Sequence, residues 1–214
     1  MEIRQNLIWS AVVVTALCLH LIAYLDKPIA LYIRTLNPAI THFFKGVTAF
    51  GDSLYYLVPS FIFFWVFRLG YKKMRESLWR ERFRRYSHSC LFLFVSIGAS
   101  GLVNDLLKIL FGRPRPKLML SGGQDSFSFF QLSSSLWSFP SGHANTAFAL
   151  MTALWVLAPR GRWLYLPLAV LVASSRVMVS KHYPSDVLAG AFLAVVVTLY
   201  VRQIFLKRGI PLSL

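Results

Sequence analysis

Acidic side chains and cysteines are both scarce in this chain of 214 residues, which contains 8 Asp and Glu and 2 Cys. The cysteines, Cys18 and Cys90, lie within apolar stretches, so neither a disulfide framework nor a cysteine-based metal site is indicated. Asp105 and Asp186 are the only acids close to the polar motifs described below, too few for a carboxylate site that binds magnesium. We therefore expect no bound metal and no cofactor.

Apolar residues, in contrast, are abundant. Hydrophobic residues make up 56% of the chain and aromatic residues 15%, which is too apolar for a soluble domain of this size. The first apolar run, Leu7–Leu25, is long for a signal-peptide core and lacks a convincing cleavage site, so we expect it to remain as a spanning helix. We predict an all-α, polytopic membrane protein with one transmembrane domain over residues 1–214 and six spanning helices, near residues 7–25, 54–67, 89–110, 144–158, 163–179 and 187–206.

The segment Lys27–Phe50, between the first two spans, is mixed rather than continuously apolar. Apolar residues recur in it every three or four positions, and Asn37-Pro38 interrupts the pattern. This pattern predicts two short amphipathic helices that lie in the interface at the outer surface of the membrane.

Positive charge dominates the chain, because 23 Lys and Arg give a formal net charge of +15 at pH 7. Eight of these cations lie between Arg68 and Arg85, directly after the second apolar run. Such a basic segment is typical of a cytoplasmic loop in contact with anionic lipids, so we expect membrane lipids as partners and no nucleic acid. With the N-terminus in the cytoplasm, fourteen of the 23 cations fall on the inner side, which predicts that both termini are cytoplasmic.

Three polar motifs fall at the outer face in this topology. They are Lys108-x6-Arg115-Pro116 after the third span, Pro140-Ser141-Gly142-His143 before the fourth, and Ser175-Arg176-x5-His182-x3-Asp186 between the fifth and sixth. Lysine and arginine donors suit the oxygens of a phosphate and the charge that develops on a pentacoordinate phosphorus. The motifs therefore predict a phosphate site formed by Lys108, Arg115 and Arg176. The Ser141 hydroxyl and free backbone N–H groups of the fourth helix add further donors.

The two motif histidines suggest complementary catalytic roles. Pro184 is suited to begin a helix, which places Asp186 in its first turn, where the carboxylate can reach back to an imidazole nitrogen of His182. An oriented imidazole with its second nitrogen free is a competent nucleophile toward phosphorus, so His182 is the predicted nucleophile. His143 is the predicted acid that protonates the leaving oxygen, and afterwards the base that activates water.

Three cations near the motifs match no motif position, namely Arg113, Lys117 and Lys181. We interpret them as interfacial anchors that add positive potential at the mouth of the site. Asp105 lies about one helical turn before Lys108 and is expected to pair with it. The segment Ser121–Trp137 is either a flexible outer loop or a lid that contacts a lipid headgroup.

The three motifs, in this order and on six spans, resemble the type 2 phosphatidic acid phosphatase superfamily. The match is complete at every motif position between Lys108 and Asp186. The resemblance implies a metal-independent phosphatase with a histidine nucleophile, whose phosphate is held by Lys108, Arg115, Ser141, the Gly142 backbone and Arg176. The compact size, cytoplasmic N-terminus and external site further resemble those of superfamily members in the bacterial inner membrane.

These features together predict a phosphoric monoester or diphosphate hydrolase that acts on a lipid at the outer face of the membrane. Candidate substrates are undecaprenyl diphosphate, phosphatidylglycerol phosphate, phosphatidic acid and lipid A. A lipid phosphotransferase would use the same residues, and an anionic-solute transporter would also place Arg, Lys and His within a helical bundle. The two halves of the sequence show no inverted repeat, which favours an enzyme, and no obligate protein partner is predicted.

Overall fold

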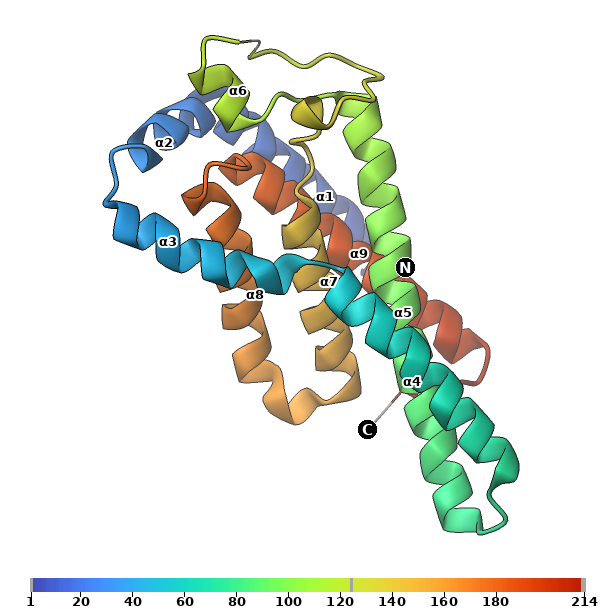
Figure 1. Cartoon of the computed structure of the whole chain (residues 1–214). Coiled ribbons are helices and arrows are strands. Elements are labelled where there is room, and N and C mark those ends of the chain that lie inside the picture. Colours follow the sequence, from blue (N-terminus) through green and yellow to red (C-terminus); the bar gives the residue numbers. More distant parts are fainter. Residues whose placement is uncertain (1, 124, 213–214) are drawn as a thin grey trace.

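The computed structural model describes residues 2–123 and 125–212, and each regular element in these ranges is helical (Figure 1). The α-helices are α1 (Glu2–His20), α2 (Asp26–Ile33), α3 (Pro38–Val47), α4 (Leu54–Lys73), α5 (Ser77–Phe111), α6 (Pro116–Leu120), α7 (Gly142–Leu157), α8 (Arg162–Met178) and α9 (Pro184–Lys207). A π-helical turn at Leu21–Leu25 joins α1 to α2, and 3-10 turns lie at Thr48–Gly51, Ser134–Leu136 and Pro159–Gly161. The expectation of an all-helical chain is confirmed for the described ranges.

Among the described residues, four helical stretches are long and apolar enough to cross a membrane: Gln5–Ile33, Pro38–Lys73, Ser77–Leu120 and Pro184–Lys207. The other two predicted spans form α7 and α8, which have 16 and 17 residues. At a rise of about 1.5 Å per residue, each is roughly 25 Å long, somewhat less than the hydrocarbon core of about 30 Å. All six apolar runs are therefore helical, while a crossing by six helices remains a prediction.

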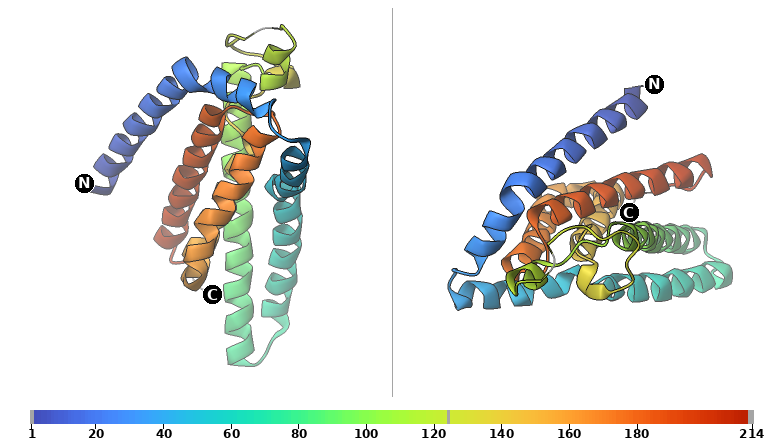
Figure 2. Two further views of the ribbon diagram at one scale, coloured as in Figure 1. Left: turned by 90° about the vertical axis from the view of Figure 1, so that its left-hand side faces the viewer. Right: turned by 90° about the horizontal axis from the view of Figure 1, so that it is seen from above.

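Helix α7 lies at the centre of the bundle, in contact with α5, α8 and α9 (Figure 1). Phe92 of α5, Leu157 of α7 and Phe205 of α9 are buried together in one core cluster. Helix α4 lies along α5, and Figure 2 shows α1 on the other side of the molecule, next to α9. Large apolar side chains such as Trp9 and Trp163 are exposed on the outside, as expected where lipid replaces water.

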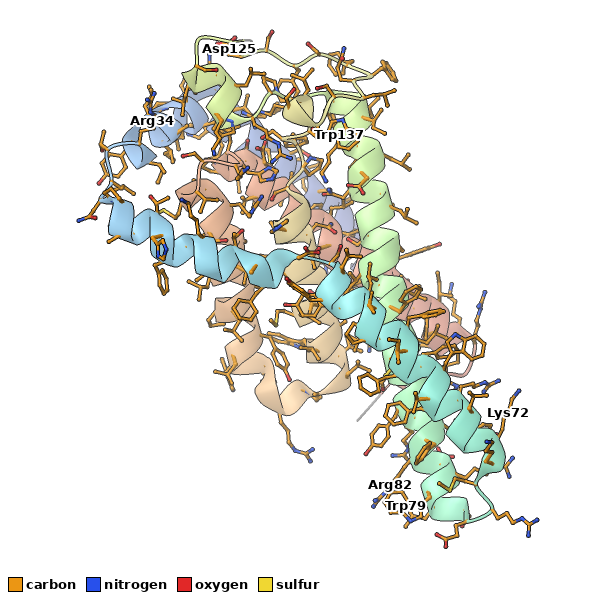
Figure 3. The ribbon with its side chains drawn as sticks, in the orientation of Figure 1. Arg34, Lys72, Trp79, Arg82, Asp125 and Trp137 are labelled. Atoms are coloured by element: carbon orange, nitrogen blue, oxygen red, sulfur yellow. The ribbon has the colours of Figure 1, made fainter. Side chains whose placement is uncertain are left out.

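Figure 3 locates the basic segment at one end of the molecule. Lys72, Trp79 and Arg82 lie at the tip of the hairpin formed by α4 and α5, and their side chains point outward. Trp137 and Asp125 lie at the opposite end, on the segment between α6 and α7. The basic segment is thus separated from the end of the bundle to which the three motifs belong.

Two short helices, α2 and α3, follow α1, and their predicted amphipathic character remains a prediction. They are separated at Asn37-Pro38, where the Asn37 side chain accepts a hydrogen bond from the Ala39 backbone N–H and Pro38 opens α3. Helix α2 follows α1 after the π-helical turn, so Asp26 lies within a continuous helical stretch. The Asp26 side chain is fully buried. The position of α2 and α3 at a membrane interface remains a prediction.

Close backbone contact between α9 and the start of α7 depends on Gly190 of α9. A Cβ atom at this position would lie 2.4 Å from the Ser141 carbonyl oxygen, which is a backbone atom and cannot rotate away. The Asn145 side chain donates a hydrogen bond of 3.3 Å to the Gly190 carbonyl oxygen, and it accepts one from the Ser100 hydroxyl of α5. Three helices are thereby fixed around the second motif.

Gly190→Ala should therefore destabilise the protein by about 1–3 kcal/mol, because the added methyl group forces α9 away from the second motif. The measurement is thermal unfolding of the detergent-purified variant. Gly46→Ala is the matched control, since a Cβ at Gly46 of α3 meets no atom within 4 Å and alanine favours a helix. Equal stability of Gly190→Ala and the wild-type protein would contradict the close contact.

Candidate active site

The second motif lies where α7 begins, and it receives contacts from the other two motifs. The Ser141 backbone N–H donates to the Asp186 carbonyl oxygen at 2.9 Å, which joins the second motif to the third. The Lys108 Nζ atom lies 3.0 Å from the point that a Cβ of Gly142 would occupy, so glycine leaves space for the ammonium group. Lys108 also forms the predicted ion pair with Asp105, at 2.7 Å.

Three polar atoms near the second motif are buried without a hydrogen-bond partner among the described residues: the Ser141 hydroxyl, the Arg176 Nε and the Asn104 Oδ1. The Ser141 side chain is fully buried, and the NH1 group of Arg176 donates to the Thr48 hydroxyl. Buried polar groups in native proteins are nearly always hydrogen-bonded, so the two unpaired donors, on Ser141 and Arg176, indicate a ligand with acceptor oxygens. Phosphate oxygens match this requirement.

His182 is buried in the loop between α8 and α9. Its Nδ1 atom lies 2.7 Å from the Ser138 carbonyl oxygen, and because a carbonyl can only accept, Nδ1 carries the proton. The Nε2 atom therefore has the free lone pair. The Asp186 Oδ2 atom is 3.6 Å from Nδ1, beyond hydrogen-bond distance. The sequence prediction that Asp186 directly orients the imidazole is corrected in this respect, because the Ser138 carbonyl does so.

Asp186 itself is fully buried and accepts several other hydrogen bonds. Its Oδ2 atom accepts from the Ser138 hydroxyl at 2.6 Å and from the Tyr183 backbone N–H at 2.8 Å, and its Oδ1 atom accepts from Arg113 at 2.6 Å. Arg113 also donates to Asp26 at 2.7 Å and is 6% exposed. The interpretation of Arg113 as an interfacial anchor is therefore wrong, because its guanidinium lies between two buried carboxylates.

Arg115 occupies the loop that follows α5, beside α6. Its Nε donates to the Ser134 carbonyl oxygen at 3.2 Å, and its backbone N–H donates to the Ser135 carbonyl oxygen at 3.1 Å. These two contacts attach the first motif to the segment between α6 and α7. The segment is ordered by backbone contacts to the end of α5 as well, since Phe130 and Gln131 donate to the carbonyl oxygens of Leu110 and Ile109.

A cavity of about 650 Å³ opens beside the second motif, between the start of α4, one face of α5 and the start of α7. Its polar end is lined by Lys108, Gly142, His143 and Asp52, and its other walls by apolar side chains that include Leu57, Phe94 and Leu102. The His143 ring packs directly on Gly51, where a Cβ would lie within 2.6–2.9 Å of the ring atoms and Cβ of His143. The cavity thus joins the predicted acid to an apolar surface.

His182 lies in the loop between α8 and α9, outside the helices. Burial lowers the pKa of His182 to about 4, and Arg176 and Arg115 act in the same direction while Asp186 opposes it. The imidazole of His182 is therefore neutral at pH 7 in the protein alone, which leaves a lone pair on Nε2.

Comparison with known proteins agrees with this geometry. Residues 89–210 match the PAP2 superfamily. A lipid A 1-phosphatase from Rhizobium johnstonii is 34% identical over 210 residues, which cover 96% of this chain and 84% of the relative. The chain belongs to the PAP2 superfamily. The predicted resemblance and the predicted phosphatase class are thereby confirmed.

Other relatives and solved structures of the PAP2 superfamily resemble the chain along most of its length. A lipid A 1-phosphatase from Rhizobium etli is 33% identical over 185 residues, covering 85% of this chain and 78% of the relative. A phosphatidylglycerolphosphate phosphatase from Bacillus subtilis has a TM-score of 0.58 and 22% identity, covering 92% of this chain and 96% of that one. LpxE from Aquifex aeolicus has a TM-score of 0.59 and 22% identity, covering 83% and 93%. The two structures share the PAP2 fold.

Sequence reasoning did not identify three residues that organise the site: Asp26, Arg113 and Ser138. The sequence Arg113-Pro114-Arg115-Pro116 contains two Arg-Pro pairs, whereas the motif requires one. The extra arginine was a signal from which Arg113 could have been found. Ser138 contributes a backbone carbonyl, a group that every residue has, and a hydroxyl that lies outside the three motifs, so it gave no signal. Asp26 lies 159 residues before Ser185, to which it is hydrogen-bonded, and no local pattern reports that contact.

The depressed pKa of His182 has a measurable consequence for stability. Below pH 6.5 the unfolded chain binds a proton at His182 that the folded protein does not, so stability should be lost as pH falls from 6.5 toward 4. Above pH 6.5 this group contributes no pH dependence. His182→Gln should lose less stability over the same interval, as measured by thermal unfolding at each pH. Parallel curves for the two proteins would contradict burial of a neutral imidazole.

Proposed function

We propose that this PAP2 protein removes the 1-phosphate of lipid A, or of a closely similar lipid phosphate, at the outer face of a bacterial inner membrane. The observation that carries this proposal is the similarity to lipid A 1-phosphatases, which extends over 96% of the chain. A sugar phosphate on a lipid anchor combines an anionic group with a large apolar body. The candidate site has cationic groups that suit the phosphate and apolar walls that suit the lipid.

The cavity beside His143 supports a lipid substrate rather than a soluble phosphate ester. Cationic and hydrogen-bonding groups gather at its end, while Leu57, Phe94 and Leu102 line its walls between α4 and α5. Those helices have exposed apolar faces, so a lipid can reach the site from the bilayer and keep its acyl chains in an apolar environment. A soluble phosphate ester has no apolar chains that could contact these walls.

The distribution of charge supports placement of the site at the outer face. The tip of the α4 and α5 hairpin carries the basic segment Arg68–Arg85, which favours the cytoplasmic side. The motifs belong to the opposite end of the bundle, so they face outward. This arrangement has six crossing helices, with α7 and α8 as short spans near the centre of the bundle, and both termini in the cytoplasm.

In the proposed reaction, the Nε2 lone pair of His182 attacks phosphorus and the bond between phosphorus and the lipid oxygen breaks. His143, as imidazolium, transfers its proton to the leaving oxygen. The bound phosphate brings negative charge next to His143, Lys108 and Arg176, and this charge favours the protonated form of His143 that the step requires. The products of this half-reaction are the lipid alcohol and a phosphohistidine at position 182.

Water completes the cycle. His143 takes a proton from the water, the water oxygen bonds to phosphorus, and the bond between phosphorus and Nε2 breaks, which restores the lone pair of His182. Inorganic phosphate leaves and His143 is again protonated. Throughout both steps, Lys108, Arg115, Arg176 and the Ser141 hydroxyl stabilise the charge on the equatorial oxygens, together with the backbone N–H groups at the start of α7.

The direct test is phosphate release by the detergent-purified protein with EDTA present. The substrates are lipid A 1-phosphate, undecaprenyl diphosphate, phosphatidylglycerol phosphate and phosphatidic acid, and lipid A 1-phosphate should give the highest kcat/KM. His182→Ala should lose about 10³-fold or more of the activity, because the nucleophile is absent. Phosphate transfer that occurs only when an acceptor lipid is added would reject hydrolysis, and an active His182→Ala would reject the mechanism.

Arg176→Lys should reduce kcat/KM by roughly 10²-fold, because a point charge cannot replace a planar two-pronged contact to phosphate oxygens. The measurement is initial-rate kinetics on the substrate that the wild-type protein prefers. Lys45→Gln, which removes an exposed cation of α3, is the control and should retain wild-type kinetics. Arg176→Lys with near-normal kcat/KM would remove Arg176 from the phosphate site.

A further inference from the structure

The hydrogen bond that orients His182 is the inner end of a longer buried network. Ser138, whose carbonyl oxygen accepts from the imidazole, donates its own hydroxyl to Asp186 at 2.6 Å. The backbone N–H of Tyr183, the residue after His182, donates to the same carboxylate oxygen at 2.8 Å. Asp186 therefore fixes the acceptor of the imidazole and the chain next to it, although it does not touch the ring with a hydrogen bond.

Arg113 connects this inner part of the network to the N-terminal helices. Its NH1 group donates to the Asp186 Oδ1 atom at 2.6 Å, and its NH2 group donates to the Asp26 Oδ2 atom at 2.7 Å. The Arg113 backbone carbonyl accepts from the Ser138 N–H at 2.9 Å, and its guanidinium lies 4.2 Å from the centre of the Tyr183 ring. A single side chain thus joins α2, the loop after α5 and the start of α9.

Asp26 is the outer end of the network and is fully buried. Its Oδ1 atom accepts from the Ser185 backbone N–H at 3.1 Å, and its Oδ2 atom accepts from the Ser185 hydroxyl as well as from Arg113. Asp26 therefore holds the first turn of α9 through Ser185, one residue before Asp186. No catalytic motif includes it.

The charges of the network explain why a second carboxylate is useful. Arg113 alone would cancel the charge of Asp186, whereas two carboxylates around one guanidinium leave a net negative charge in the buried interior. Formation of the bond between Nε2 of His182 and phosphorus leaves the proton on Nδ1, so the ring gains positive charge. A net negative network beside the ring stabilises that charge.

We propose that Asp26 is a positioning residue for the phosphatase reaction. It acts on His182 through Arg113, Ser185 and Asp186. It fixes the start of α9 and keeps the buried network negative while the phosphohistidine forms. This inference rests on the proposed function, because it requires His182 to be the nucleophile. It gives the N-terminal helices an indirect part in the chemistry, through the position and charge of the network.

The test compares Asp26→Asn with Asp26→Glu in the full-length protein. Asparagine has the size of aspartate without its charge, so kcat should fall about tenfold or more while KM stays within about threefold. Glutamate keeps the charge but adds a methylene group, and its kcat should exceed that of the asparagine variant. A role in packing alone predicts the opposite order, because the isosteric change is then the milder one. That order, or an unchanged kcat in Asp26→Asn, would overturn the proposal.

Controls separate this inference from the proposed function and from misfolding. Asp125→Asn removes a carboxylate from the exposed ion pair with Lys27 and should keep wild-type kinetics. A wild-type protein that releases no phosphate would reject the proposed function before the variants are compared. Should Asp26→Asn fail to fold, Ser185→Ala removes a hydroxyl that donates to Asp26 and accepts from Arg113, while all charges remain. It should lower kcat by about threefold at unchanged KM, and an unchanged kcat would overturn the proposal.

Discussion

Arg113 holds two carboxylates inside a bundle whose exterior is built for lipid, and the catalytic arrangement depends on this contact. A carboxylate in an apolar interior is costly unless it is paired and hydrogen-bonded. The planar guanidinium satisfies Asp26 and Asp186 at once, with separate N–H groups directed at each. The remaining carboxylate oxygens are occupied by serine hydroxyls and backbone N–H groups. Because every bond in this network has a fixed direction, the loop that carries His182 has little freedom.

The substrate itself has a part in the proposed proton transfer. A bound phosphate would place negative charge beside Arg176 and His143, and this charge would favour the protonated imidazole that the leaving oxygen requires. In the proposed reaction, the acid is therefore formed together with the bound substrate.

Much of the fold was predictable because apolar runs of spanning length and the Asn37-Pro38 break are local signals. The motifs also predicted which residues would meet, and the structure places Lys108 over Gly142 and Ser141 against Asp186. The partners of those residues were not predictable in the same way. Arg113 and Arg115 are two positions apart in one loop, and the sequence does not say which one turns inward. The lengths of α7 and α8 were likewise not predictable. Each helix ends at the candidate site on one side and at the turn Pro159–Gly161 on the other.

The predicted contact between Asp186 and His182 illustrates the same limit. An aspartate in the first turn of a helix four residues after a histidine can reach the imidazole, and it comes within 3.6 Å. The backbone carbonyl of Ser138 competes for the same proton and lies closer, at 2.7 Å. Tertiary packing decides which of the two acceptors receives the Nδ1 proton. The spacing of residues in the sequence does not contain this information.

The network that joins α2 to α9 also has a consequence for biogenesis. The helices that contribute Asp26 and Asp186 are among the first and the last to leave the ribosome, and neither can complete the site without the other. Under the proposed mechanism, a chain that has inserted only its earlier helices would lack the anchored loop that carries His182. The proposed nucleophile would be in place only once α9 has docked against α2.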